Sequence, residues 1–434
     1  MNLIGNINAI PFRRFRGGGG VAPFPSIPGM IARYSALGLT NEQMAANPVW
    51  VDKTGNGHDL QMKNFAWKEG SGISDVYLGE LVFDGVDDYG VCDNFPILTK
   101  EKGYTVVALR QWITYNPNVI SAIATNASDQ SFNGAFTFEN YNKGAEQTIS
   151  YGATQISLQY SKSPFSWQTT SKYNGVNIAN GNKDATNSLV LGRSYPQRND
   201  FANFAIWELV FLDHDATEEE LTKIKDYFVK TYPWLFPDQA WTVVGKTNED
   251  EDRATIANIT GNGNDLVLSN FGFAEGSGYN EEGEYAGYLV TDGVDDKIVS
   301  SSFGMGKDFT IVGDWKFIDN KKSGTGLVKG SSFYIYNTMT GLVLYINSGS
   351  VKNSLDGIKS INAACSDGRA YDRNWNEILA NTGNVVGSGG TLEVSSSGGR
   401  FDRIAFKNLA IYPRILSKDD CIKAYNYLQT LKAK

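Results

Sequence analysis

Two acidic motifs in the sequence have a spacing that could hold a cation or form a turn. Both have the string Asp-Gly-Val-Asp-Asp, and their aspartates are Asp84, Asp87 and Asp88 in the first copy and Asp292, Asp295 and Asp296 in the second. Carboxylates at this spacing offer the hard oxygen ligands that calcium prefers. The same string suits a hairpin turn, in which glycine adopts a positive φ and the aspartates accept hydrogen bonds from turn amides. We predict the turn, with calcium as the alternative and no other cofactor.

Two tryptophans are candidates for contact with a glycan. Trp167 lies in the polar stretch Ser-Pro-Phe-Ser-Trp-Gln, and Trp375 lies in Arg-Asn-Trp-Asn. An exposed aromatic ring beside amide or carboxylate groups can stack on a sugar, whereas most large aromatic residues pack at least partly in a core. Neither tryptophan has an obvious counterpart in the internal repeat described below. We therefore expect core packing at both residues, with glycan binding as the alternative.

The residue types needed for common hydrolytic mechanisms are missing. The only histidines are His58 and His214, and the internal repeat replaces them with Asn264 and Arg414. A histidine base or histidine metal site common to both halves is therefore excluded. Glycoside cleavage needs two positioned carboxylates, and the alternating Glu-x-Asp-x-x-Glu strand motif of sandwich glycosidases does not occur in the sequence. We predict that the protein is not an enzyme.

The first 30 residues contain a segment suited to docking on a partner. Aromatic and cationic side chains alternate in Phe12, Arg13, Arg14, Phe15 and Arg16, and four glycines at 17–20 follow as a flexible spacer. Guanidinium groups form forked hydrogen bonds with carboxylates, and aromatic rings anchor small interfaces. We predict that residues 1–30 dock on an acidic protein surface, the alternative being a disordered tail. Because one short peptide binds weakly, we expect a homo-oligomer, a dimer or trimer, whose arms bind together.

These candidate residues belong to a chain that contains an internal repeat of about 200 residues. Thr-Gly-Asn-Gly at 54–57 returns at 260–263, and the acidic motif returns 208 positions later. Several further matches occur in the same order with small changes of offset, as a duplicated domain with loop insertions would leave. We predict an arm followed by two homologous domains, at residues 1–30, 31–236 and 237–434.

Both repeats have the same succession of predicted elements. Runs rich in β-branched and aromatic residues predict strands at 104–109, 188–191, 309–312 and 341–346. Thr217 and Glu220 form a capping box before an amphipathic segment, and Ser417 and Asp420 form a weaker one. The sequence therefore predicts one closing helix in each repeat, at 217–230 and 417–431.

Composition and charge narrow the class of protein. The 46 glycines and 12% aromatic residues favour strands joined by tight turns, so we predict an all-β fold. A net charge of −8 disfavours nucleic acid as a partner. No run of 18 apolar residues occurs, so no membrane insertion is expected. Cys92, Cys365 and Cys421 cannot all pair, and the arginines follow the apolar start, so we expect synthesis in a reducing cytoplasm without a signal peptide.

Three motifs carry a resemblance to a known family. Asp-Lys-Thr-Gly-Asn-Gly at 52–57, Phe-Asp-Gly-Val-Asp-Asp-Tyr at 83–89, and the late strand at 401–417 resemble the laminin-G-like, concanavalin A-type jelly roll. The resemblance implies two tandem jelly-roll sandwiches, each closed by one helix. One extended arm precedes the first sandwich. This fold occurs in lectins, glycosidases and virion proteins alike, so it specifies a fold better than an activity.

The tandem arrangement behind an arm is similar to head-fibre or decoration proteins of crAss-like tailed phages. That resemblance implies a non-enzymatic virion protein, made in the host cytoplasm, that docks on capsid proteins through its arm and adheres to host or mucus glycans. A carbohydrate-binding surface protein of a bacterium and a tail-associated receptor-binding fibre are the alternatives.

Overall fold

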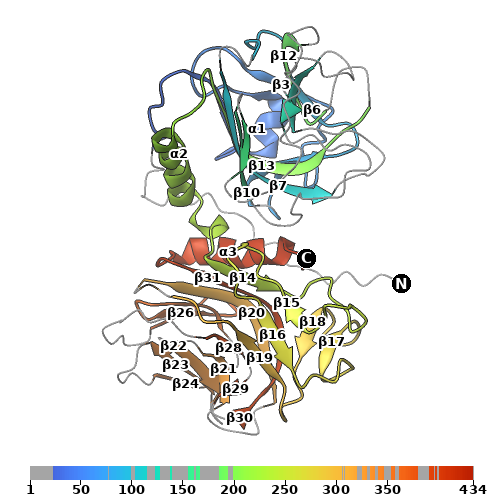
Figure 1. Cartoon of the computed structure of the whole chain (residues 1–434), viewed down its shortest axis with the longest axis vertical. Helices are drawn as coiled ribbons and strands as arrows, with labels where there is room; N and C mark the ends of the chain where they lie inside the picture. The colour runs from blue at the N-terminus through green and yellow to red at the C-terminus, as the bar shows by residue number, and fades with distance from the viewer. Residues whose placement is uncertain are drawn as a thin grey trace.

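The computed structural model describes residues 23–433 except 77, 99–102, 115–122, 128–136, 139–154, 161–162, 167–184, 194–198, 305, 307, 320–324, 330–332, 338–340, 347–352, 357–360, 380–390, 395 and 398–399. Antiparallel strands dominate this part of the chain, and they form two pairs of sheets (Figure 1). The predicted all-β fold is thereby confirmed. None of the helices in the described ranges has the length and apolar character needed to cross a bilayer.

The first sandwich is built from residues 30–212. Its larger sheet has the order β11-β10-β7-β13-β5-β4, with β1 also paired to β13, and its smaller sheet has the order β2-β3-β6-β12-β8-β9. The strands of the larger sheet are β1 (Met30–Ser35), β4 (Gly72–Ser74), β5 (Glu80–Asp84), β7 (Thr105–Thr114), β10 (Gln155–Tyr160), β11 (Ser163–Ser166) and β13 (Asn203–Leu212). Those of the smaller sheet are β2 (Val49–Trp50), β3 (Leu60–Lys63), β6 (Tyr89–Cys92), β8 (Ala124–Ala127), β9 (Thr137–Phe138) and β12 (Ala185–Leu191).

The second sandwich is built from residues 239–412. Its first sheet has the order β17-β18-β31-β20-β25-β26-β27, with β14 also paired to β31, and its second has the order β15-β16-β19-β28-β21-β22-β23-β24. The first sheet contains β14 (Gln239–Thr242), β17 (Gly278–Asn280), β18 (Tyr288–Val290), β20 (Thr310–Asp319), β25 (Ile361–Cys365), β26 (Arg369–Asp372), β27 (Glu377–Leu379) and β31 (Arg403–Tyr412). The second contains β15 (Thr255–Ile256), β16 (Leu266–Ser269), β19 (Lys297–Ser300), β21 (Thr325–Lys329), β22 (Phe333–Asn337), β23 (Gly341–Ile346), β24 (Asn353–Asp356) and β28 (Glu393–Val394). β29 (Ser396–Ser397) and β30 (Arg400–Phe401) form a separate pair.

The two sandwiches share a strand order and even its irregularities. The order β4-β5-β13-β7-β10-β11 corresponds strand for strand to β17-β18-β31-β20-β25-β26. The register shifts between β13 and β7 recur between β31 and β20 at corresponding residues. Bulges are specific local features of a sheet, so their recurrence indicates that both halves have one backbone plan. The predicted strands at 104–109, 188–191 and 309–312 overlap β7, β12 and β20, and the one at 341–346 is β23.

The helices form where the sequence predicts them. α2 (Glu218–Thr231) begins at a complete capping box, in which the Thr217 hydroxyl accepts from the Glu220 amide and the Glu220 carboxylate accepts from the Thr217 amide. α3 (Lys418–Thr430) begins at Ser417, whose hydroxyl accepts from the Asp420 amide. The two predicted closing helices are confirmed to within one residue. Two short helices, α1 (Asn41–Ala46) and η1 (Pro233–Leu235), were not predicted from the sequence.

Among the described residues, three large apolar clusters stabilise the structure. One fills the first sandwich and another fills the second. The third cluster, which we call the shared cluster, combines residues of both sandwiches with α2, η1 and α3, including Val107, Trp207, Trp234, Val312 and Tyr412. Figure 1 shows η1 and α3 between the two sandwiches. Strands β7, β13, β20 and β31 are thus covered on both faces over part of their length.

An ion pair is buried beneath α2 in the first sandwich. The Arg33 guanidinium lies 3.0 Å from the Glu208 carboxylate, and their side chains are 13% and 0% exposed. Glu208 also accepts hydrogen bonds from Ser35 (2.8 Å) and Tyr232 (2.7 Å). Burial raises the pKa of Glu208, and the positive charge of Arg33 opposes that rise. The Arg33 side chain also lies 4.2 Å from the ring centre of Phe24, so residues before β1 pack on the first sandwich.

We predict that Arg33→Ala lowers the free energy of unfolding by about 3 kcal/mol, because it leaves the Glu208 carboxylate buried without its cation. Urea denaturation followed by tryptophan fluorescence measures the change. Lys223→Ala, which removes an exposed pair with Glu219, is the control and should change stability by less than about 0.5 kcal/mol. A similar small loss in both variants would contradict the prediction.

Candidate functional site

The candidate site lies on the hairpin that joins β26 to β27 in the second sandwich. The Asp372 carboxylate accepts from the amides of Asn374 and Asn376, both at 2.8 Å, and the Trp375 amide donates to the Asp372 carbonyl at 3.0 Å. Trp375 itself has a φ of 61°, which is uncommon for a bulky residue. The turn thus holds Trp375 at its tip in a backbone conformation that costs free energy.

Trp375 is half-buried against two tyrosines. Its ring lies 6.3 Å from Tyr371 on β26 and 5.6 Å from Tyr425 on α3, the second contact at 82°. These contacts fix one part of the indole ring and leave another part accessible. Exposed Asn374 is adjacent to it. This pairing of a fixed aromatic surface with an amide has the chemistry that sugar contact requires, and the glycan alternative for Trp375 stays untested.

A buried carboxylate connects the hairpin to the sheet. Asp314 on β20 accepts from the Tyr288 hydroxyl at 2.9 Å and from the Arg373 guanidinium at 3.3 Å. Arg373 also donates to the Trp315 carbonyl at 2.7 Å. Burial raises the pKa of Tyr425, and the nearby Asp314 charge adds to the rise. Asp314 therefore positions Arg373, which lies in the same turn, two residues before Trp375.

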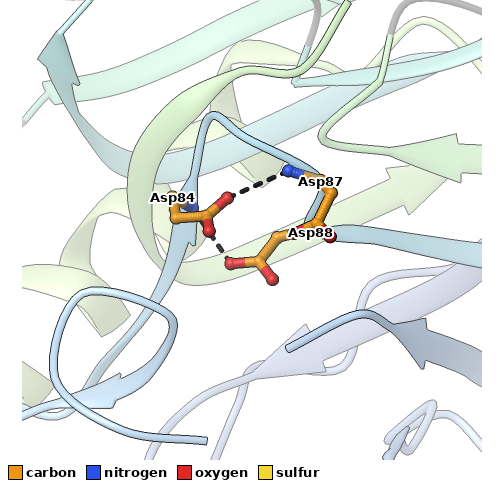
Figure 2. A group of neighbouring side chains, drawn as sticks. All are labelled: Asp84, Asp87 and Asp88. Atoms are coloured by element: carbon orange, nitrogen blue, oxygen red, sulfur yellow. Dashed lines mark hydrogen bonds between the residues drawn. The ribbon is translucent and has the colours of Figure 1, made fainter. Parts of the chain in front are cut away.

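The two acidic motifs form turns that connect the two sheets of each sandwich. Asp84 accepts from the amides of Val86 (2.7 Å) and Asp87 (3.3 Å), and Asp88 accepts from the Asp84 amide (3.0 Å), as Figure 2 shows in part. Gly85 has a φ of 75°. These are the hydrogen bonds that the turn interpretation requires. The prediction of a hairpin was wrong, however, because β5 and β6 lie in different sheets and the glycine lets the chain cross between them.

Residues repeated elsewhere in the sequence complete the same network. The Ser71 hydroxyl donates to Asp88 at 3.0 Å, and the Asn64 amide group donates to the Asp87 carbonyl at 3.0 Å. The second sandwich has the same contacts, made by Ser277 with Asp296 and by Asn270 with the Asp295 carbonyl, while Asp292 accepts from two turn amides. The repeated residues therefore recur because they fix this crossing.

The aspartates of each turn are also close enough to share a cation. One oxygen from each of Asp84, Asp87 and Asp88 can be chosen so that all lie within 4.8 Å, and the same holds for the second motif. Burial raises the pKa of Asp88 to about 7 and that of Asp296 to about 6. Both carboxyl groups thus retain a proton well above the usual range, and the calcium alternative stays a prediction.

The remaining candidate residues lie apart from this site or outside the described residues. Trp167 and the docking residues Phe12, Arg13, Arg14, Phe15 and Arg16 are outside the described ranges. His58 is near Phe95, at 5.4 Å between ring centres. His214 contacts Asp213 at 3.0 Å and Glu220 at 3.2 Å. Partial burial lowers the pKa of His214, but the two carboxylates outweigh burial and raise it. Asp314 and Arg373 could not be singled out from the sequence, where the string around Trp375 is their only signal.

Comparison with known proteins identifies no family for this chain. No family model matches it, and no curated protein does. Among solved structures, a sialidase of Trypanosoma rangeli matches at 9% identity over 53% of this chain and 41% of its own, with a TM-score of 0.32. The binding domain of botulinum neurotoxin serotype D matches at 10% identity over 91% of this chain and 97% of its own, with a TM-score of 0.31. The chain spans about two fifths of the length of that sialidase. Neither similarity is evidence for the function of this chain.

We predict that calcium does not stabilise the acidic turns. Asp84→Ala should lower the free energy of unfolding by about 1 kcal/mol with or without calcium, because it removes the acceptor of two turn amides. Asp292→Ala is the matched variant in the second sandwich. Calorimetric titration checks the metal directly, and micromolar calcium binding that Asp87→Ala abolishes would contradict the turn interpretation.

We also predict a pH dependence from Asp88. Unfolded aspartate ionises near a pKa of about 3.9, whereas folded Asp88 keeps its proton up to about 7. The folded state favours the neutral form of Asp88. The contribution of Asp88 to the free energy of unfolding is therefore complete below pH 4 and is lost as the pH rises toward 7. Asp88→Asn should flatten the stability curve over this range, and exposed Asp87→Asn should not. Urea denaturation from pH 4 to 8 checks this, and equal slopes for wild type and Asp88→Asn would refute it.

Proposed function

We propose that the protein is a non-enzymatic structural component of a tailed-phage virion, a head fibre or capsid decoration protein. In this role the N-terminal arm docks on an acidic surface of a capsid protein, and the two sandwiches project outward. The observation that supports the proposal best is the shared cluster, because it joins two sandwiches of the same plan into one body. Such a body suits display at a distance from an attachment point.

The use of the titratable residues supports a non-enzymatic role. His214 and Glu220 belong to the start of α2, where Glu220 completes the capping box. The aspartates of both acidic motifs accept hydrogen bonds from turn amides and a serine. These groups therefore have structural roles in the fold, as a non-enzymatic display protein requires.

Carbohydrate binding is the second candidate function. The half-buried Trp375 ring at a turn tip, with exposed Asn374 beside it, favours this function. It is compatible with the virion role, since a head fibre can adhere to glycans. It also fits the alternatives of a bacterial surface protein and a tail-associated receptor-binding fibre.

We predict that a chain starting at Val21 no longer joins the particle. The truncation removes three guanidinium groups and two phenyl rings that would anchor the small interface. Copies per particle, counted by quantitative mass spectrometry of purified virions, measure the effect. The full chain carrying Trp375→Phe is the control and should assemble normally.

Folding of the truncated chain is checked by circular dichroism, since residues 24–30 pack on the first sandwich and remain in it. Normal occupancy of the truncated chain would refute docking through the arm. Failure of the full-length chain to appear in purified particles would refute the virion role itself.

A further inference from the structure

Two lysines on neighbouring strands lie over one tyrosine ring in the second sandwich. The Lys316 ammonium, on β20, lies 4.4 Å from the ring centre of Tyr288, and the Lys407 ammonium, on β31, lies 5.8 Å from it. Both lysine side chains are half-buried. In the part of the chain that the structure describes, neither ammonium makes an ion pair or a hydrogen bond. Two cations thus lie over one aromatic ring on the same face of the sheet.

The first sandwich shows that the fold does not require these charges. Its strands have the same register and bulges, so the positions of Lys316, Lys407 and Tyr288 each have a counterpart there. Lys316 corresponds to Gln111, which is 1% exposed, and Lys407 corresponds to Trp207, which is 2% exposed. At these positions one sandwich has a covered face and the other has accessible cations. The shared backbone plan therefore does not require a positive charge at either position.

The surrounding charges leave this face positive. Burial lowers the pKa of Lys316, and the repulsion of Arg373 and Lys407 acts in the same direction. Asp314 and Glu284 attract Lys316 and oppose that effect. Asp314 is, however, already bonded to Tyr288 and Arg373. A positive face is unusual on a chain whose net charge is −8, and an added anion would relieve the repulsion between the lysines.

The positive face continues directly into the Trp375 hairpin. Arg373 bonds to the carbonyl of Trp315, the residue before Lys316, and Trp375 follows Arg373 by two residues. The Trp375 ring is held by Tyr425, which lies near Asp314. One end of this surface therefore suits a carboxylate, and the other suits the apolar face of a sugar ring.

We propose that Lys316, Lys407 and Trp375 form a binding site for an acidic saccharide, in which the two ammonium groups bind a sugar carboxylate and the indole ring stacks on a neighbouring sugar unit. Asp314 and Arg373 act as positioning residues that hold the hairpin against the sheet. This inference extends the carbohydrate-binding candidate to a class of ligand. It does not rest on the virion role, which occupancy of particles tests separately.

Isothermal titration calorimetry of the full chain tests the proposal. The probes are sialyllactose and a hyaluronan hexasaccharide, which carry carboxylates, and lactose, which does not. We expect at least one acidic probe to bind, more weakly at high salt, and lactose not to bind. The double variant Lys316→Ala/Lys407→Ala should lower the affinity at least about tenfold. Trp375→Phe should weaken binding less than Trp375→Ala.

Two controls keep the result interpretable. Lys297→Ala removes an exposed lysine that lies 5.8 Å from the Phe401 ring in the same sandwich, and it should leave binding unchanged. Thermal melts confirm that each variant is folded. If Trp375→Ala does not fold, the double lysine variant still tests the site. No binding of either acidic probe up to about 10 mM, equal binding of lactose, or unchanged affinity in the double lysine variant would each overturn the proposal.

Discussion

The shared cluster between the two sandwiches is the constraint on which the rest of the structure depends. β13 and β31 run through the centre of their sheets and bury one face in each sandwich core and the other in the shared cluster. A jelly roll that stood alone would expose the second face to water. Here the side chains on that face must be apolar or fully paired, as Glu208 is with Arg33. Beside Tyr288, where the shared cluster no longer covers this face, the half-buried lysines Lys316 and Lys407 replace the apolar side chains.

The bulge in β13 and β31 shows how the two halves diverged on one backbone. It places Glu208 in the first sandwich and Asn408 in the second at corresponding positions, both fully buried. Glu208 binds Tyr232 just after α2, and Asn408 donates to the Leu428 carbonyl of α3 at 3.2 Å. Each polar side chain thus ties a closing helix to its sheet. The fold was preserved by keeping this link, while the chemistry of the outer face changed.

Much of the fold could be predicted from the sequence because its signals are local or repeated. The capping residues Thr217 and Ser417 identify their helices within a few positions, and the repeat at 206 to 208 residues implies a common strand order. The candidate site was only partly predictable. Trp375 was singled out by its polar surroundings, but its link to Asp314 joins residues 59 positions apart through Arg373. Such a contact depends on which strands lie side by side, and no local pattern encodes it.

Differential scanning calorimetry of the intact chain tests most directly whether the two sandwiches form one body. If the shared cluster couples them, the wild type should unfold in one transition whose calorimetric and van't Hoff enthalpies agree. Trp234→Ala, which removes a cluster residue that is 4% exposed, should split that transition into two. Two independent transitions in the wild type, unaffected by Trp234→Ala, would contradict the coupling of the two sandwiches.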